Sequence, residues 1–456
     1  MKTHRPHVRQ EEHFVGNVVR LGQADGAIVA LETPDGLVDA RVPGTVPGDR
    51  VVVKIRHVGA HALWGDLVEV LTPSPDRVDA PCEVVLKCGG CPLQMVNLTA
   101  QRLIKRTELE QKLGKLNENL LWQTWQPNTR TTGYRTRALM MTRRRRGRLE
   151  TGFFAPGTDN LVPTETCVVQ HPQVEQVLGR ARELLDRAGV TTWRDADRPG
   201  QLRALLFRLD PAQRSGLLTL VVTTDSGLQP IADHLRDIPG VAGVFANIHT
   251  APGGAVLGPE TRHLAGATHQ MVEIGNTPLL LGPTAFLQTR HDAAEAIVAT
   301  LQRLLPEKME HLLDLYAGIG VFGLTLRARC KKVTLVERDP AGALDASRNI
   351  ERLRATHVHV REEAAETAVL ALTELQPDAV VLDPPRAGCS VDVLNAIAQS
   401  PSLRCIIYVS CNATSLARDL HRLADLGWKP AEIVPIDMFP HTLHAEWVVR
   451  LDKVAQ

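Results

Sequence analysis

The sequence predicts an α/β protein in which a doubly wound C-terminal domain follows a small β-barrel and a mixed central domain. Residues 12–72 contain five short strand-like runs between glycine turns, and residues 276–456 alternate short apolar runs with helical stretches. The chain has 456 residues, and chains beyond ~250 to 300 residues usually divide into domains. These observations together predict the three-part organisation.

The N-terminal barrel is expected over residues 12–72. Its runs alternate β-branched with polar residues, in "GNVVRL", "GAIVALET", "GLVDARV", "DRVVVKIRHV" and "GDLVEVL". This alternation is typical of strands with one buried face. Five such strands with glycine turns predict a closed barrel of the OB type.

The central domain is expected over residues 73–275 and begins at the linker "TPSPDRVDAPC". Apolar residues from Leu98 to Leu116 recur near helical spacing, which predicts a helix at 98–116. We expect this helix to pack on the C-terminal domain. The strand-like runs "RALLFRLD" and "GLLTLVVTT" indicate mixed α and β structure in the rest of this domain.

The C-terminal domain is expected over residues 276–456. The runs "HLLDLYAG", "KVTLVERD", "DAVVLDPP" and "CIIYVSCN" each end in a polar residue or a tight turn. Parallel strands that are buried on both faces have this composition, so a Rossmann-like, doubly wound sheet is predicted. Ligands bind at the carboxyl ends of such strands.

The composition, with 44% hydrophobic and 23% charged residues, is that of a soluble globular protein. No apolar run of ~18 residues predicts a membrane helix, and the N-terminus "MKTHRPHVRQEEH" lacks the apolar core of a secretory signal. We therefore expect a cytoplasmic protein. The net charge is only +1, but residues 128–150 hold eight arginines against one glutamate, 8 − 1 = +7. This stripe indicates either phosphate contacts or a solvated hairpin.

Three of the eight cysteines lie close together in "PCEVVLKCGGCPLQM", at Cys82, Cys88 and Cys91. Cytosolic thiols are kept reduced, so clustered cysteines there more often bind metal or perform chemistry than form disulfides. A disulfide framework is disfavoured. A metal site and a redox centre both remain open.

A glycine loop follows the first strand of the C-terminal domain. "DLYAGIGVFG" carries Gly318, Gly320 and Gly323 in GxGxxG spacing, and Glu337 ends the next strand about 20 residues on. Glycines let the backbone approach a nucleotide closely, and the carboxylate can accept ribose hydroxyls. NAD and S-adenosylmethionine both fit this outline.

Two further strand ends indicate methyl transfer through a thiol. "VVLDPPRAG" places Asp383-Pro384-Pro385 at a strand end, a pattern of nucleic-acid base methyltransferases. Arg386 stands where the amine methylases have an aromatic residue, which argues against exocyclic amine chemistry. In "YVSCNATSLARDL" Cys411 lies between a strand and a helix, and thiols near helix N-termini can have a depressed pKa.

A cysteine and a methyl donor share one chemistry on uracil. C5 is a weak nucleophile, but thiolate addition at C6 makes an enolate whose C5 attacks an electrophilic methyl group. A base must then remove the C5 proton. "DMFPHTLHAEWVVRL" offers Glu446, with His441 and His444 nearby, and a buried carboxylate with a raised pKa suits this task.

Together, "YVSCN", "LARDL", "DPPRAG", "DMFPHTLHAE" and the cysteine pattern resemble the S-adenosylmethionine-dependent RNA uracil-5-methyltransferases, in particular the 23S ribosomal RNA branch. The resemblance spans nearly the whole chain. It implies that the barrel is an RNA-binding TRAM domain, that Cys411 is the nucleophile and that Glu446 is the base. The implied donor-site or substrate-site residues are Gln288, Tyr316, Gly318, Gly320, Glu337 and Asp383.

The resemblance also implies a [4Fe-4S] cluster, held by Cys82, Cys88, Cys91 and Cys167. By spacing alone, four thiolates suit zinc equally well. We expect the cluster to hold the central domain and orient RNA, because the methyl transfer needs no electron. This sequence departs from the family pattern at four positions that bear on donor binding and on the RNA target, namely Arg290, Val321, Ala364 and Ala413.

The expected partner is RNA, most of all 23S ribosomal RNA, with its uridine flipped out or in a loop because C5 and C6 are inaccessible within a stack. A transfer RNA target is less expected, because the T-loop enzymes generally lack the barrel and the cysteine cluster. No membrane and no obligate protein partner are expected. The alternatives are a non-catalytic RNA-binding or assembly factor, and a dinucleotide-dependent iron–sulfur oxidoreductase, which would leave "DPPRAG" and Cys411 unexplained.

Overall fold

The computed structural model describes residues 8–22, 26–126, 130–193, 200–251 and 256–454. The chain forms two compact units. The N-terminal unit comprises residues 1–104, 152–168 and 439–443, and the other comprises residues 105–151, 169–438 and 444–456. None of the helices in the described ranges combines the length and the apolar character needed to cross a membrane.

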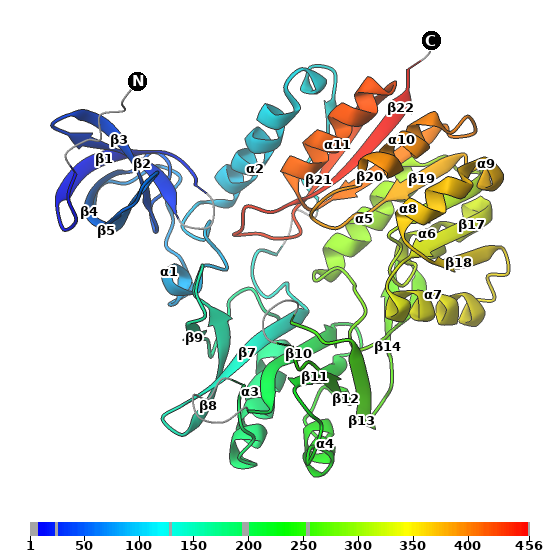
Figure 1. Ribbon diagram of the computed structural model, residues 1–456, viewed down its shortest axis with the longest axis horizontal. Coiled ribbons are helices and arrows are strands. Elements are labelled where there is room, and N and C mark those ends of the chain that lie inside the picture. Colours follow the sequence, from blue (N-terminus) through cyan, green and yellow to red (C-terminus); the bar gives the residue numbers. More distant parts are fainter. Residues whose placement is uncertain (1–7, 23–25, 127–129, 194–199, 252–255, 455–456) are drawn as a thin grey trace. The chain divides into compact units, whose positions relative to one another are not determined.

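The closed N-terminal barrel predicted from the sequence is confirmed, and its strands are drawn in blue in Figure 1. The strands are β1 (His13–Arg20), β2 (Ala27–Thr33), β3 (Gly36–Val42), β4 (Arg50–Val58) and β5 (Leu63–Thr72). Their order is β1-β2-β3-β5-β4, and β4 pairs with β1 to close the barrel. Alternate side chains such as Leu31, Val53 and Ile55 are fully buried inside, as the two-residue period of a strand requires.

Further elements lie wholly or partly in the N-terminal unit: α1 (Val85–Cys88), the first turns of α2 (Leu98–Leu113), the end of β8 (Arg148–Phe154) and β9 (Leu161–Pro163). Helix α1 ends at Gly89, whose φ of 66° is left-handed. A Cβ atom on Gly89 would lie 2.1 Å from Pro156 Cγ. Only glycine therefore fits where the cysteine-rich segment meets residue 156.

A seven-stranded sheet has the order β13-β12-β11-β10-β7-β8-β9 and ends at β9 (Leu161–Pro163). Its other strands are β7 (Arg137–Arg145), β8 (Arg148–Phe154), β10 (Leu202–Asp210), β11 (Ser215–Val222), β12 (Val241–Ile248) and β13 (Glu260–Gly266). Helices α3 (Pro172–Arg187) and α4 (Gln229–Arg236) contact this sheet. A hairpin of β14 (Gln270–Ile274) and β15 (Thr277–Leu281) follows.

The C-terminal sheet has the order β18-β17-β16-β19-β20-β22-β21-β6. Five strands are parallel: β16 (Met309–Leu315), β17 (Cys330–Glu337), β18 (Val358–Glu362), β19 (Ala379–Leu382) and β20 (Cys405–Ser410). Strand β22 (Glu446–Lys453) is antiparallel to β20 and β21 (Trp428–Ile436), and β6 (Leu121–Trp122) pairs with β21. The predicted doubly wound domain is thus confirmed, and its strand order reverses at β16, where ligands bind in such sheets.

Helices connect and cover these strands (Figure 1). They are α5 (His291–Leu304), α6 (Val321–Leu326), α7 (Pro340–Arg352), α8 (Ala365–Ala368), α9 (Leu372–Leu375), α10 (Val391–Gln399) and α11 (Ala413–Asp425). The C-terminal half of α2 contributes Leu109 and Leu113 to the core of this domain. Helix α2 ends at Leu113, earlier than Leu116, because Gly114 begins a tighter 3-10 turn with a positive φ.

Candidate active site at the carboxyl ends of the C-terminal strands

The glycine loop leaves β16 through residues with positive φ, including Tyr316 at 65° and Gly320 at 86°. Helix α6 then packs closely on β17. A Cβ atom on Gly323 would lie 2.3 Å from Leu335 Cδ2, and one on Gly320 would lie 2.8 Å from Leu335 Cδ1. The glycines at 320 and 323 are therefore required for the close approach of helix and strand.

Glu337 lies at the end of β17, beside this loop. Its Oε2 accepts a hydrogen bond from the Gly318 N–H at 2.8 Å, and its Oε1 accepts one from the Asp339 N–H at 2.7 Å. Two backbone donors therefore fix the orientation of the carboxylate. Each oxygen keeps further acceptor capacity for a ligand hydroxyl.

A cavity of about 320 Å³ opens at the ends of β16, β17 and β19. Its lining comprises Tyr316, Val336, Arg338, Glu363, Ala365, Glu366, Pro385, Ala387, Gly388, Cys389, Ser390 and Arg418. Of the predicted donor-site residues, Tyr316 belongs to this lining, and Glu337 follows Val336 in the chain. Gln288 instead lines a much smaller hollow together with Arg137 and Arg208.

The loop that carries Gln288 is tied down at several points. The Gly282 N–H donates to Asp345 Oδ2 at 2.7 Å, and the Thr136 N–H donates to the Thr289 carbonyl at 2.9 Å. Arg290, a departure from the family pattern, is 1% exposed. Its guanidinium pairs with Asp292 and donates to the Asp437 carbonyl at 2.9 Å, so this arginine has a structural function that the sequence does not reveal.

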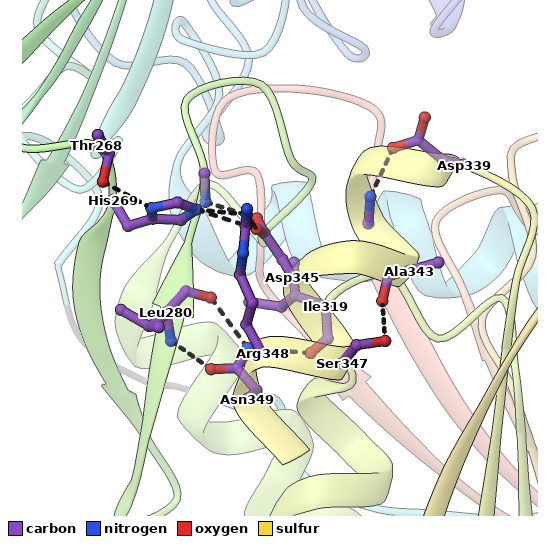
Figure 2. A network of polar contacts seen from close by, with 12 residues as sticks. Thr268, His269, Leu280, Ile319, Asp339, Ala343, Asp345, Ser347, Arg348 and Asn349 are labelled. Atoms are coloured by element: carbon purple, nitrogen blue, oxygen red, sulfur yellow. Dashed lines mark hydrogen bonds and ion pairs between the residues drawn. The ribbon is translucent and has the colours of Figure 1, made fainter. Parts of the chain in front are cut away.

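Helix α7 anchors both the glycine loop and the end of β15, as Figure 2 shows. Asn349 Oδ1 accepts from the Leu280 N–H at 2.6 Å, and its Nδ2 donates to the carbonyls of Leu280 and Ile319 at 3.0 and 3.4 Å. Arg348 Nη1 lies 3.2 Å from Asp345 Oδ1 and 2.8 Å from His269 Nε2. One polar face of α7 therefore holds both the glycine loop and the end of β15.

Cys411 is half-buried and lies between β20 and α11. Asn412 caps that helix, since its Oδ1 accepts from the N–H groups of Thr414 and Ser415. Burial and, after it, the carboxylates of Glu446 and Asp383 raise the pKa of the Cys411 thiol, whereas Arg386 lowers it by charge and by a hydrogen bond; the net pKa is about 11. The depressed pKa expected from the helix N-terminus is therefore wrong for this state, because burial and two nearby acids dominate.

Glu446 is the first residue of β22 and is only 3% exposed, so it is not a solvent-facing strand residue. Burial raises its pKa well above the usual range, with a further increase from Asp383 and a decrease from Arg386. Burial also raises the pKa of Asp383, to about 7. Cys411, Glu446, Asp383 and Arg386 therefore form one electrostatically linked group. Glu446 Oε2 has no hydrogen-bond partner among the described residues.

Two members of the site were not recognised from the sequence. From the sequence, Arg386 is only an argument against amine chemistry, whereas in the structure it interacts with both Cys411 and Glu446. Asp314 is buried in β16, and its Oδ2 accepts from the Gly323 N–H at 2.8 Å. Burial raises the pKa of Asp314 to about 7. The sequence signal for it was its place in "DLYAGIGVFG", two residues before Tyr316.

The predicted metal ligands Cys82, Cys88, Cys91 and Cys167 all lie in the N-terminal unit. Within the described ranges, however, no three or more His, Cys, Asp or Glu side chains are arranged so that they could hold a metal ion. The four thiols as they stand therefore do not form a ligand set. His441, predicted near the base, is buried in the same unit, with its Nδ1 3.2 Å from Gln101 Nε2, and His444 is exposed.

Comparisons with known proteins show which family this chain resembles. Residues 282–454 match the family model of tRNA (Uracil-5-)-methyltransferase. An uncharacterized RNA methyltransferase of Gloeobacter violaceus is 32% identical over 432 residues, which cover 91% of this chain and 93% of the relative. Another from Thermosynechococcus vestitus is 32% identical over 418 residues, covering 90% and 92%.

A solved structure shares the fold. It is the Pyrococcus abyssi tRNA (uracil-54, C5)-methyltransferase in complex with S-adenosyl-L-homocysteine, with a TM-score of 0.76 and 23% identity, covering 96% of this chain and 100% of that one. The similarity thus extends over nearly all of this chain, well beyond the segment that the family model matches. With relatives of this identity and coverage, the chain belongs to a family of RNA methyltransferases, and its C-terminal domain matches the tRNA (Uracil-5-)-methyltransferase model.

Proposed function

We propose that this enzyme transfers a methyl group from S-adenosylmethionine to C5 of a uridine in RNA, through a transient bond between Cys411 Sγ and C6 of the base. One observation carries the proposal. A thiol, two buried carboxyl groups and a guanidinium form one interacting group at Cys411, Glu446, Asp383 and Arg386. This combination supplies a nucleophile, a base and a positive charge at one place.

The proposed reaction begins when the Cys411 thiolate adds to C6 of uracil. The C5–C6 π electrons move to C5 and O4 as an enolate, and C5 takes the methyl group from the sulfonium donor, which leaves as S-adenosylhomocysteine. A base removes the C5 proton, and the electrons of that C–H bond re-form the C5–C6 double bond as the thiolate leaves. Glu446 is the proposed base, since its raised pKa makes it a stronger base than a solvated carboxylate.

Arg386 has a specific task in this scheme. The Cys411 pKa of about 11 leaves little thiolate at neutral pH. Arg386 is the group that favours the charged form of the thiol, so it lowers the cost of forming the nucleophile. Arginine at this position is thus consistent with thiolate chemistry, where an aromatic residue would supply no charge.

The donor is proposed to bind beside the glycine loop. Glu337, held by the Gly318 N–H, has the acceptor geometry for ribose hydroxyls. Tyr316 lines the cavity, and Gly320 allows close approach of the backbone. Asp383 and Gln288 are proposed to act at the donor or the substrate.

The proposed RNA target is 23S ribosomal RNA, with the barrel acting as a TRAM-type binding module. The arginine-rich segment contributes phosphate contacts in this proposal, although Arg144 already pairs with Asp186 at 2.8 Å. A transfer RNA target is the second candidate. The P. abyssi enzyme, whose name specifies tRNA, aligns over 96% of this chain. The presence of the N-terminal barrel therefore does not distinguish a ribosomal RNA target from a transfer RNA target.

We also propose that Cys82, Cys88, Cys91 and Cys167 bind a [4Fe-4S] cluster, with zinc as the alternative. The support is their spacing and their place in one compact unit. Because their present arrangement could not hold a metal, the ligands would have to draw together on binding, as happens when metal binding is coupled to folding. Iron, sulfide and zinc analysis of anaerobically purified protein, with the Cys91→Ser variant as control, tests this.

The decisive experiment maps 5-methyluridine in ribosomal and transfer RNA from cells that lack this protein and from cells that carry wild type or Cys411→Ala. We expect the loss of 5-methyluridine at defined ribosomal positions and its return with wild type only. An unchanged map would favour a non-catalytic assembly factor. Melting temperatures measured with S-adenosylhomocysteine and with NADH distinguish a methyltransferase from an oxidoreductase. We expect only S-adenosylhomocysteine to raise the melting temperature.

A further inference from the structure

The carboxylate of Asp419 joins three segments around the proposed nucleophile. Asp419 belongs to α11, the helix that begins two residues after Cys411, and its side chain is completely buried. Its Oδ2 accepts from the Tyr408 hydroxyl at 2.6 Å and from the Cys389 N–H at 2.8 Å. Its Oδ1 accepts from Arg418 Nε at 2.8 Å. Helix α11, strand β20 and the loop after β19 thus meet at one carboxylate.

The loop after β19 is held by a two-residue clasp. Arg418 Nη2 donates to the carbonyls of Ala387 and Cys389 at 2.8 and 3.3 Å. Asp419 accepts a hydrogen bond from the Cys389 N–H. Gly388, at the centre, has a φ of 80°. A Cβ atom there would lie 2.5 Å from Asp419 Oδ2 and 2.6 Å from Arg418 Nη2. No side chain fits between the loop and the clasp.

This loop connects the two halves of the proposed chemistry. It begins at Asp383 and carries Arg386, which favours the thiolate form of Cys411. It also lines the cavity through Pro385, Ala387 and Gly388. The placement of Arg386 relative to Cys411 therefore depends on how the loop is fixed to α11.

Stability alone gives a poor account of this clasp. Burying the Asp419 carboxylate costs desolvation energy, and its partner Arg418 has a side chain that is 59% exposed, so solvent screening weakens this ion pair. A carboxylate with three donors in different segments fixes their relative position more narrowly than apolar packing would. The geometry thus favours a function in alignment.

We propose that Asp419 is a positioning residue, which holds the loop carrying Arg386 in register with Cys411. This inference rests on the proposed function, because it assigns the clasp to thiolate formation. The charged groups that act on the Cys411 thiol are Glu446, Asp383 and Arg386. Release of the loop lets Arg386 withdraw, which leaves two acids and burial to oppose the thiolate.

The test uses the full-length chain and the variants Asp419→Asn and Gly388→Ala. Asp419→Asn keeps the shape but cannot accept from all three donors. Gly388→Ala adds a Cβ atom that pushes the loop away from Asp419 and Arg418, and it removes no charge. Asp425→Asn is the matched control, since Asp425 is an exposed carboxylate on the same helix. Circular dichroism identifies the temperatures at which each variant is folded.

Two readouts are measured on folded protein. The first is the pH dependence of iodoacetamide alkylation at Cys411, followed by peptide mass spectrometry. The second is the rate at which a covalent adduct forms with S-adenosylmethionine and RNA that contains 5-fluorouridine in place of the target, since after methyl transfer C5 carries fluorine and a methyl group and no removable proton. We expect Asp419→Asn and Gly388→Ala to shift the alkylation profile to higher pH and to slow adduct formation by roughly 10- to 100-fold, and Asp425→Asn to behave as wild type.

The outcomes are separable. If the folded Asp419 and Gly388 variants alkylate with the wild-type pH profile, the clasp serves only stability and the inference is overturned, even if their activity is lower. If wild-type protein forms no adduct with the fluorinated RNA, the proposed function fails. The alkylation profiles still decide whether the clasp positions the loop, since they need neither RNA nor donor.

Discussion

The Lys105 ammonium lies 3.1 Å from the Asp437 Oδ1 atom, and both side chains are only 1% exposed. Lys105 belongs to the part of α2 that packs in the second unit, and Asp437 follows β21. Arg290 donates to the backbone carbonyl of the same Asp437. Helix α2, the residue before α5 and the residue after β21 therefore meet at Asp437. Ile436, next to Asp437, pairs with Glu446 at the start of β22.

Removal of one partner of this pair should be costly. We expect Lys105→Ala to lower the free energy of unfolding by about 3 to 5 kcal/mol, because it leaves a buried carboxylate without that ion-pair partner. The double variant Lys105→Met/Asp437→Leu should lose much less. Lys112→Ala, which breaks a partly exposed pair with Glu108 at 3.8 Å in the same helix, should cost less than about 1 kcal/mol. Calorimetric unfolding measures all three, and equal losses in single and double variants would contradict the assignment.

The raised pKa of Glu446 predicts opposite pH effects on rate and on stability. The base form is needed for proton removal, so the single-turnover methylation rate should rise as pH increases through the raised pKa. Stability runs the other way. The folded pKa exceeds the unfolded value of about 4.3, so the contribution of neutral Glu446 is complete below that value and is lost as pH rises through the folded pKa.

Asp314 and Asp383, with folded pKa values of about 7, add to this loss between about pH 4 and pH 8. Glu446→Gln should slow methylation by roughly 10²- to 10⁴-fold and flatten the stability profile. Rates and melting temperatures across this pH range provide the measurement. The Cys411 thiolate fraction also increases with pH over this range, so Glu446→Gln should keep only a shallower rise in rate. A pH dependence as steep as that of wild type would exclude Glu446 as the base.

Arg386 should control the nucleophile. Because its charge lowers the Cys411 pKa, Arg386→Gln should raise that pKa and reduce methylation at neutral pH, with recovery as pH is increased. Arg386→Lys should recover part of the effect by keeping the charge. Arg404→Gln, an exposed arginine just before β20, is the control and should leave the pH–rate profile unchanged. A uniform loss at every pH would mean that Arg386 acts on RNA binding and not on the thiol.

Asn349 should influence donor binding from outside the cavity. Asn349→Asp removes the amide that donates to the Leu280 and Ile319 carbonyls and places acceptors opposite acceptors, which costs about 1 to 3 kcal/mol. We expect weaker S-adenosylhomocysteine binding by calorimetry, because the glycine loop loses an anchor. Ser347→Ala is the control, since among the residues that the structure describes that hydroxyl bonds within α7, to the Ala343 carbonyl at 3.0 Å (Figure 2). Equal S-adenosylhomocysteine affinity of wild type and Asn349→Asp would show that these hydrogen bonds of Asn349 do not influence donor binding.

The sequence by itself determined the barrel and the doubly wound sheet. Alternation with a period of two marks strands with one buried face, and short apolar runs ending in turns mark parallel strands buried on both. These are local properties of consecutive residues, so the sequence of each segment by itself predicts the strands β16, β17, β19 and β20. The place of Cys411 between a strand and a helix was readable for the same reason.

Only the tertiary structure decided the state of the site. The Cys411 pKa depends on Glu446, Asp383 and Arg386, which are far from it in sequence, and on burial, so a local reading of the helix N-terminus gave the opposite sign. The functions of Arg290, Asp314 and Asp419 likewise arise from partners that the fold brings near. Strands are encoded by neighbours along the chain, whereas electrostatics is set by neighbours in space.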